Sequence, residues 1–279
     1  SLHDALPIYF NARAAVPDIE MMARLAAENP LGMSLYRPLE AEPGTLRFKL
    51  FHLGGPVTLS DSLPMLERMG LRVLDERPHR VRPPDQVPVW LHDFGMQTAL
   101  ADADIDIHEL HPVFEDAFGR IFRGEVENDD FNRLVVAARM PAAEIVVLRA
   151  YAKYVRQIGF PLSQSFIEAT LAANAGIAAD LVALFRARFD PEVPGGGDDE
   201  AVARRRAVET ALEAVDNLSE DRVLRQLLAL ILATTRTNFW RRDAEGRPRS
   251  FLSFKFDPAK VPGLPEPRPM FEIFVYSPR

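Results

Sequence analysis

The period of the hydrophobic pattern changes near Ile107, and this change constrains the fold more than any other feature of the sequence. In residues 46–53 every second side chain is apolar, as in a half-buried β-strand. From about Ile107 onward, apolar residues recur at the 3.6-residue spacing of amphipathic helices. The alternation returns in residues 252–256. This order predicts an α+β chain that has a helical middle and strands on both sides of it.

The first part of the chain predicts a ferredoxin-like unit. Ser60, Asp61 and Ser62 form an N-cap cluster for a helix over 63–69 that ends at Gly70. Segments 71–77 and 87–94 predict two further strands. Because prolines interrupt regular structure, Pro78, Pro83 and Pro84 predict a long irregular connection between them. With the strand over 46–53, the order is β-α-β-β, the opening of a ferredoxin-like sandwich.

The middle of the chain predicts seven short helices with apolar faces. Ser165 and Glu168 have the spacing of a capping box for the fourth helix, and either Asn217 or Ser219 can cap the seventh. Between the fifth and sixth helices, residues 190–200 contain two prolines and three consecutive glycines, which indicates a flexible loop or linker. These helices predict a compact helical domain.

The two ends of the sequence suggest a piece of a longer protein. Residues 270–276 are rich in β-forming side chains and predict a buried strand, which needs hydrogen-bonding neighbours on both sides. Little of this sequence remains to supply them. Residues 1–9 are expected to be an artefact or disordered, because 1–8 follow neither a helical nor an alternating pattern.

Composition excludes several classes of function. The net charge of -7 argues against a general nucleic-acid binder, which needs a basic surface. The absence of cysteine removes disulfides, thiolate nucleophiles and cysteine-ligated metal. No uncharged apolar run approaches the roughly 20 residues of a membrane helix, and no signal peptide opens the sequence. We therefore expect a soluble cytoplasmic protein.

Two histidine clusters are candidates for chemistry. His108 and His111 lie three residues apart on a predicted helix, near Glu109 and Asp116, and this spacing suits a metal site. The sequence contains no HExxH motif, however, so the exposed start of a helix is the simpler interpretation. His92, followed directly by Asp93, could act as an oriented general base. No nucleophile in a strained turn accompanies it, and we favour a structural histidine.

A basic stripe on the third predicted helix is the candidate binding surface. Arg149, Lys153 and Arg156 share one helical face, with Tyr151 and Tyr154 interleaved. The stripe could receive an anion, an acidic neighbouring domain or a nucleotide phosphate. The alternative, which we favour, is the solvated side of an amphipathic helix.

The remaining charged and glycine-rich motifs predict no site. Residues 204–206 are three arginines close to the acidic residues 198–200, and local neutralisation explains them. The glycines at 195–197 lack the GxGxxG spacing, and no GxxxxGK[ST] motif is present. The residues therefore predict no catalytic, cofactor-binding or metal-binding position.

Six segments together resemble the large NAD-specific glutamate dehydrogenases of bacteria. They occur in the order of that family and cover nearly the whole chain from about Phe10. One departure is Phe122, where the family pattern leads us to expect tryptophan. The segments are LPMLERMGLRVLDER at 63–77, DDFNRLV at 129–135, LRAYAKYVRQ at 148–157, GFPLSQSFIE at 159–168, EDRVLRQLLALILATTRTN at 220–238 and RPMFEIFVYSPR at 268–279.

The resemblance implies an internal fragment of such an enzyme, made of the last ACT-type unit (10–100), a helical domain (101–245) and the first strands of a truncated catalytic domain (246–279). The parent would deaminate L-glutamate oxidatively to 2-oxoglutarate and ammonia, with NAD as hydride acceptor. Its catalytic residues and its NAD site would lie outside these residues. The fragment itself would be regulatory and architectural, inactive alone, with the rest of the polypeptide and a homo-oligomer as partners.

A rival hypothesis from a different class of function is a self-contained helical interaction module without enzyme activity. It would use Arg149, Lys153 and Arg156 to bind an acidic partner.

Overall fold

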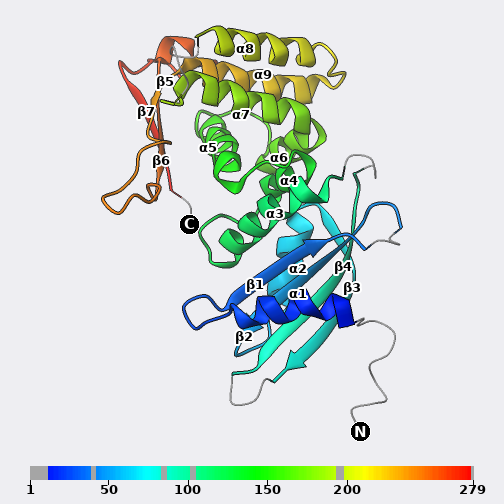
Figure 1. The fold of residues 1–279 in the computed structure, drawn as a ribbon. Coiled ribbons are helices and arrows are strands. Elements are labelled where there is room, and N and C mark those ends of the chain that lie inside the picture. The colour runs from blue at the N-terminus through cyan, green and yellow to red at the C-terminus, as the bar shows by residue number, and fades with distance from the viewer. Residues whose placement is uncertain (1–11, 39–41, 83–86, 101–104, 193–197, 278–279) are drawn as a thin grey trace. The chain divides into compact units, whose positions relative to one another are not determined.

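The computed structural model describes residues 12–38, 42–82, 87–100, 105–192 and 198–277 (Figure 1). The chain divides into two compact units. The first runs to Gly119 without residues 68–70, and the second comprises 68–70 and the chain from Arg120. The division falls inside helix α3 (Ile107–Phe122). The predicted α+β class is confirmed, because a β-sheet forms the centre of the first unit and helices followed by strands form the second.

The first unit is built on a four-stranded antiparallel sheet with the strand order β1-β2-β4-β3. The segment from β2 to β4 has the predicted β-α-β-β order. Helix α1 and strand β1, which precede it, were not predicted. The elements are α1 (Ala12–Ala23), β1 (Leu31–Tyr36), β2 (Thr45–Leu53), α2 (Leu59–Arg68), β3 (Leu71–Val81) and β4 (Val89–Thr98).

Strand β1 gives this sheet a permuted chain order. In a ferredoxin-like βαββαβ unit the fourth strand follows the second helix and pairs with the first strand. Here α3 follows β4 as the second helix, but the strand that pairs with β2 is β1, which comes before it in the chain. The unit is therefore a circularly permuted ferredoxin-like fold, with its closing strand at the front.

Different helices pack on the two faces of the sheet. On one face Phe48 packs against α3, with ring centroids 5.2 Å from Phe114 and 4.9 Å from Phe118. On the other face α1 lies across the sheet (Figure 1), where Met21 packs against a buried cluster that contains Phe51. Because side chains alternate along β2, Phe48 and Phe51 fall on opposite faces.

Two expectations for this unit are wrong. Residues Ser60–Ser62 lie in the first turn of α2, not before it, because the amides of Asp61 and Ser62 already bond to the Thr58 carbonyl. Pro78 does not end the strand but lies within β3, opposite His92. Since β3 is an edge strand, the N–H that proline lacks is not required there. Pro83 and Pro84 lie outside the described residues.

The second unit combines a helical bundle with a three-stranded antiparallel sheet of order β5-β6-β7. Strand β5 was not predicted, because its sequence TTRT carries no apolar alternation. The elements are the end of α3, then η2 (Asp130–Asn132), α4 (Arg133–Ala137), α5 (Ala142–Gln157), α6 (Gln164–Ala173), α7 (Ala175–Phe189), α8 (Asp198–Leu212), α9 (Leu218–Ala233), β5 (Thr234–Thr237), β6 (Leu252–Phe256), η4 (Pro258–Lys260) and β7 (Glu272–Tyr276).

Stacked aromatic rings join the sheet of the second unit to helix α5. Tyr151 stacks on Phe254 with ring centroids 4.2 Å apart, and Tyr154 stacks on Phe256 at 4.4 Å. The Tyr151 hydroxyl also lies 2.7 Å from the hydroxyl of Thr234, at the end of α9. The sheet and the helices therefore share one hydrophobic core.

The helix caps test the sequence analysis directly. Asn217 caps α9, where its side chain accepts from the amides of Ser219 and Glu220. The expected capping box at Ser165 is wrong: Ser163 caps α6, because its Oγ accepts from the Phe166 amide at 3.2 Å. Glu168 instead accepts a hydrogen bond from Gln164. Of the predicted linker 190–200, residues 198–200 belong to α8, and 193–197 lie outside the described residues.

Candidate functional site: an ionic cluster around Arg149

Helix α5 does not present the predicted basic stripe to solvent. Arg149 is fully buried, as are Tyr151 and Tyr154, whereas Lys153 is half-buried and only Arg156 is exposed. The interpretation of the stripe as a solvated helix face is therefore wrong. The reason is that η2 and the loop before it cover this part of α5 and supply acidic partners for Arg149 and Lys153.

Asp129 is the main partner of Arg149. Arg149 Nε donates to Asp129 Oδ2 and Nη2 donates to Oδ1, both at 2.8 Å, which is the bidentate geometry of an arginine–carboxylate pair. Nη2 also donates to the side-chain oxygen of Asn132 at 2.9 Å. Burial alone lowers the pKa of Arg149, but the hydrogen bonds and the charge of Asp129 outweigh burial, and the pKa rises above its ordinary value.

Glu127 widens the pair into a cluster. Its Oε2 lies 3.5 Å from Arg149 Nε and 3.8 Å from Lys153 Nζ. Tyr276 of β7 lies beside these charges, where burial, and then the negative charge of Glu127, raises its pKa. The cluster therefore connects η2, α5 and the last described strand. Asp129 and Glu127 were not predicted as its members, because partners 20 residues apart leave no periodic signal in the sequence.

The cluster is built for structure more than for proton transfer. A guanidinium that is paired with carboxylates stays charged at every ordinary pH, so it can orient or neutralise a group but cannot exchange a proton. The Arg149–Asp129 pair holds the start of η2 against α5 through its two hydrogen bonds, whereas Arg149 Nη1 and Glu127 Oε2 have no hydrogen-bond partner among the described residues.

His92 is the structural histidine that the sequence analysis favoured. It is buried on β4, where Nε2 accepts from the Val57 amide at 3.2 Å and Nδ1 lies 2.8 Å from Glu76 Oε1. Asp93 points to the other face of the sheet and accepts from Arg47 at 2.9 Å. Since His92 and Asp93 face opposite sides, they do not form a catalytic pair.

His108 and His111 lie exposed in the first turns of α3, as the simpler interpretation expected. In the described ranges, no group of three or more histidine, aspartate or glutamate side chains has an arrangement that could hold a metal ion.

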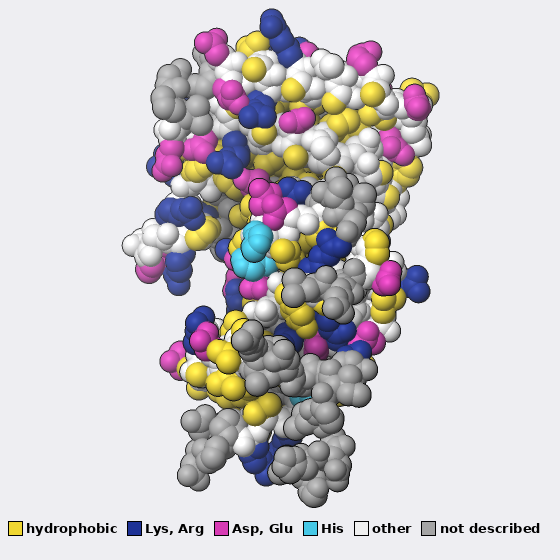
Figure 2. Space-filling model, turned by 45° about the vertical axis from the view of Figure 1, so that its right-hand side comes forward, with side chains coloured by type: hydrophobic (Ala, Val, Ile, Leu, Met, Phe, Trp, Pro, Cys, Tyr) yellow, Lys and Arg dark blue, Asp and Glu magenta, His cyan; other side chains and the backbone are white. Residues whose placement is uncertain are grey.

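The arginine run of α8 is neutralised locally, as expected. Arg204 pairs with Glu200 at 2.7 Å and Arg205 pairs with Glu209 at 2.8 Å. On the face shown in Figure 2, basic and acidic side chains are likewise interspersed over the described surface. The glycines at 195–197 lie outside the described residues.

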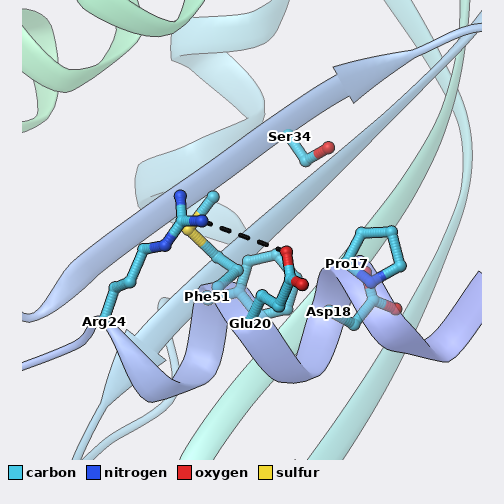
Figure 3. A pocket seen from close by; sticks show the side chains of 7 residues that line it. Pro17, Asp18, Glu20, Arg24, Ser34 and Phe51 are labelled. Atoms are coloured by element: carbon cyan, nitrogen blue, oxygen red, sulfur yellow. Dashed lines mark ion pairs between the residues drawn. The ribbon is translucent and has the colours of Figure 1, made fainter.

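A second ionic contact, under helix α1, was also not predicted. Lys49 Nζ lies 2.6 Å from Asp18 Oδ2, and both side chains are buried between α1 and the sheet. Next to it is a hollow of about 160 Å³ lined by Pro17, Asp18, Glu20, Met21, Arg24, Ser34 and Phe51 (Figure 3). Its mouth carries the exposed pair Glu20–Arg24, 3.9 Å apart. The hollow has too few convergent polar groups to define a ligand.

The described residues do not fit an NAD site of the usual kind. Such a site lies at the end of a parallel βαβ unit, where a glycine-rich turn leads into a helix. Both sheets of the described chain are paired antiparallel throughout, and the turn from β2 into α2, which contains Gly54 and Gly55, lacks the GxGxxG spacing.

Three models of domains from one enzyme class match the chain in succession. The model described as "Glutamate dehydrogenase, ACT3 domain" matches residues 30–110, and "Glutamate dehydrogenase, helical motif 3" matches 126–191. "Bacterial NAD-glutamate dehydrogenase, catalytic domain" matches 207–279. The first match covers the permuted sheet, the second contains the Arg149 cluster, and the third starts inside α8 and includes β5–β7. The chain is thus homologous to a glutamate dehydrogenase.

Three similar proteins carry the same name, NAD-specific glutamate dehydrogenase. The NAD-specific glutamate dehydrogenase of Halomonas elongata is 45% identical over 271 residues, 97% of this chain. The enzymes of the same name from Pseudomonas aeruginosa and Mycobacterium tuberculosis are 43% and 39% identical over 97% and 95% of the chain. The chain corresponds to one continuous region of NAD-specific glutamate dehydrogenases and spans only 16–17% of the length of these relatives.

In the described part of the chain, no single helix is long and apolar enough to cross a membrane. Helices α6 and α7 reach the necessary length and hydropathy only when taken together, and they are bent by 97° at the break between them.

Proposed function

We propose that this chain is a regulatory and architectural region of an NAD-specific glutamate dehydrogenase, comprising its last ACT-type unit, a helical segment and the start of its catalytic domain. The parent enzyme would convert L-glutamate to 2-oxoglutarate and ammonia with reduction of NAD. It would act in the cytoplasm as a homo-oligomer. The observation that carries this proposal is the identity of 39–45% along nearly the whole chain, together with three domain matches in succession.

The geometry of the chain supports a role in positioning. The Arg149 cluster joins residues of the helical-motif match (Glu127, Asp129 and Arg149) to Tyr276 of the catalytic-domain match. The ion pairs themselves lie within the helical-motif match, and the phenol of Tyr276 is buried beside them. The absence of a parallel βαβ turn from the described residues supports an NAD site elsewhere in the polypeptide.

The rival helical interaction module loses its binding surface. It required Arg149, Lys153 and Arg156 to face an acidic partner together, but Arg149 is buried and Lys153 already lies near Glu127.

The proposal is tested by comparing the 279-residue chain with the full-length native polypeptide that contains it. We expect the full-length protein to form NADH from NAD and L-glutamate, and the chain alone to form none. Circular dichroism of the chain confirms that a lack of turnover is not a lack of folding. Turnover by the chain alone, or a full-length protein that does not oxidise glutamate, would contradict the proposal.

A further inference from the structure

Strand β7 has a second apolar face that points away from its own unit. Its inward side chains are buried, and Phe274 lies 5.3 Å from Tyr154, ring centroid to ring centroid. Its outward side chains are Ile273 and Val275, which are 63% and 57% exposed. The two residues before the strand, Met270 and Phe271, are 84% and 62% exposed. Four large apolar side chains are therefore exposed within this short segment, two of them on the outward face of β7.

The edge of β7 is also open. In the described residues β7 pairs with β6 alone, at the end of the sheet order β5-β6-β7. Natural edge strands are usually protected by a central lysine, a proline or a bulge. The sequence EIFVY contains none of these, and its pairing with β6 has no irregularity. Lys255 on the neighbouring β6 lies near the residue before β7, with its Nζ 5.0 Å from the centre of the Phe271 ring.

The composition of β7 fits a strand covered on both faces. A strand with one wet face alternates apolar with polar residues, whereas a strand inside a layered domain is apolar on both sides. After Glu272, all residues of β7 are apolar or aromatic. By contrast, the neighbouring β6 alternates Ser253 and Lys255 with buried residues. Among the three strands of this sheet, the outward apolar side chains are thus particular to β7.

We infer that the free edge and outward face of β7 dock a further β-strand of the same catalytic domain, contributed by the dehydrogenase polypeptide outside these 279 residues. This inference rests on the proposed function. The choice of partner follows from the match of β5–β7 to the catalytic-domain model and from the 17% of the Halomonas relative that the chain spans. Backbone pairing at the edge gives the added strand its register, and Ile273 and Val275 give it apolar contacts.

The absence of cysteine from the chain allows a direct test. Ile273→Cys and Val275→Cys are made singly in the 279-residue chain and in the full-length native polypeptide, and each thiol is labelled with a maleimide. Val202→Cys serves as the control, because Val202 is also β-branched, is 50% exposed and lies on α8 before the catalytic-domain match. Peptide mapping identifies the labelled position, and circular dichroism confirms folding.

We expect both β7 thiols to react at least tenfold more slowly in the full-length protein than in the chain, with little change at position 202. Amide exchange of the peptide 271–277 should slow in parallel, which reports the edge independently of the substitutions. Equal reactivity and equal exchange in the two proteins would overturn the inference. Protection that is already present in the chain and disappears on dilution would assign the face to a second copy and would also overturn it. NAD-dependent turnover measured on the same full-length preparation tests the proposed function separately.

Discussion

The guanidinium of Arg149 and the carboxylate of Asp129 form two parallel hydrogen bonds of 2.8 Å inside the second unit. The two residues belong to different elements, since Arg149 lies in the middle of α5 and Asp129 immediately precedes η2. The pair therefore fixes how η2 lies on α5. Arg149 is fully buried, so its charge has lost the stabilisation that water would provide. The hydrogen bonds and negative charges of its partners offset this desolvation free energy.

Replacing Arg149 by methionine should destabilise the second unit strongly. Arg149→Met leaves Asp129 and Glu127, whose side chains are only 13% and 18% exposed, without their main cation, and breaking a buried pair costs about 3–5 kcal/mol. Urea unfolding at pH 7 measures the loss. The control is Arg156→Met on the same helix, where an exposed arginine should contribute less than about 0.5 kcal/mol. Equal midpoints for the two variants would refute a structural role of the cluster.

Replacing Asp18 by alanine should release α1 from the first unit. Asp18→Ala removes the buried carboxylate through which α1 pairs with Lys49, so the docking of α1 weakens while the rest of the sheet keeps its contacts. Amide exchange in α1 should accelerate at least tenfold, and exchange in β2 and β4 should change little. Glu20→Ala is the control, because Glu20 is exposed and its ion pair with Arg24 is long at 3.9 Å. Similar acceleration in both variants would exclude Lys49–Asp18 as the anchor.

Glu115 of α3 accepts a hydrogen bond from a backbone amide of the edge strand β1. Its Oε1 accepts from the Leu35 amide of β1 at 2.8 Å. Glu115→Ala leaves a buried backbone donor without its acceptor, at a cost of about 1–3 kcal/mol, whereas Glu115→Gln keeps an acceptor oxygen. We expect the alanine variant to unfold at lower denaturant and the glutamine variant to remain close to the unchanged protein. If both variants lose the same stability, the charge of Glu115 matters more than its hydrogen bond.

The Glu115→Gln variant also predicts a pH dependence. Burial raises the pKa of Glu115 above the ordinary value of 4.5. The native state therefore favours the protonated carboxyl, so its contribution to stability is complete below pH 4.5 and is lost as the pH rises through the raised pKa. Since glutamine cannot ionise, its stability relative to glutamate should improve between about pH 4 and pH 7. Urea midpoints across this range measure the difference, and a difference that shrinks with rising pH would contradict the sign.

The buried tyrosines are expected to ionise at a higher pH than free tyrosine, whose ordinary pKa is about 10. Burial raises the pKa of Tyr36 to about 12 and raises the pKa values of Tyr151, Tyr154 and Tyr276 as well. The stability that these neutral phenols provide is complete below about pH 10 and is lost as the pH rises through their raised values. Of the five tyrosines in the sequence, at most one should ionise by pH 11 while the protein stays folded. Tyrosinate absorbance measures this, and three or more phenolates in a folded protein at that pH would disprove it.

Hydrophobic periodicity predicted most elements of the fold but not its ionic contacts. The apolar pattern predicted the strand at 46–53 and the helix that contains Leu224 and Ile231. It could do so because these apolar side chains are buried in a continuous core. Arg149 occupies a helix position that is polar in the pattern and is nevertheless fully buried. Its burial depends on Asp129, and pairing between distant segments leaves no signal in a local pattern.

Strands that depend on their position in a sheet were the least predictable. Pro78 continues β3 because that strand is at an edge, which the residues around it do not reveal. The expectation of a buried strand at 270–276 is wrong for one of its faces, since Ile273 and Val275 are exposed while Phe274 and Tyr276 are buried. The local sequence specified an extended, apolar segment, but the number of neighbouring strands is a property of the whole sheet.

The front position of β1 has a consequence for synthesis on the ribosome. In the βαββαβ order of a ferredoxin-like unit, the sheet is complete only after the strand that follows the second helix has emerged. Here the closing strand emerges first, so every strand of the sheet has left the exit tunnel by the time Thr98 does, and α3 is the last piece that the unit needs. The nascent chain can thus complete this unit before most of the helices that follow have been translated, which shortens the time during which its apolar sheet face is open to aggregation.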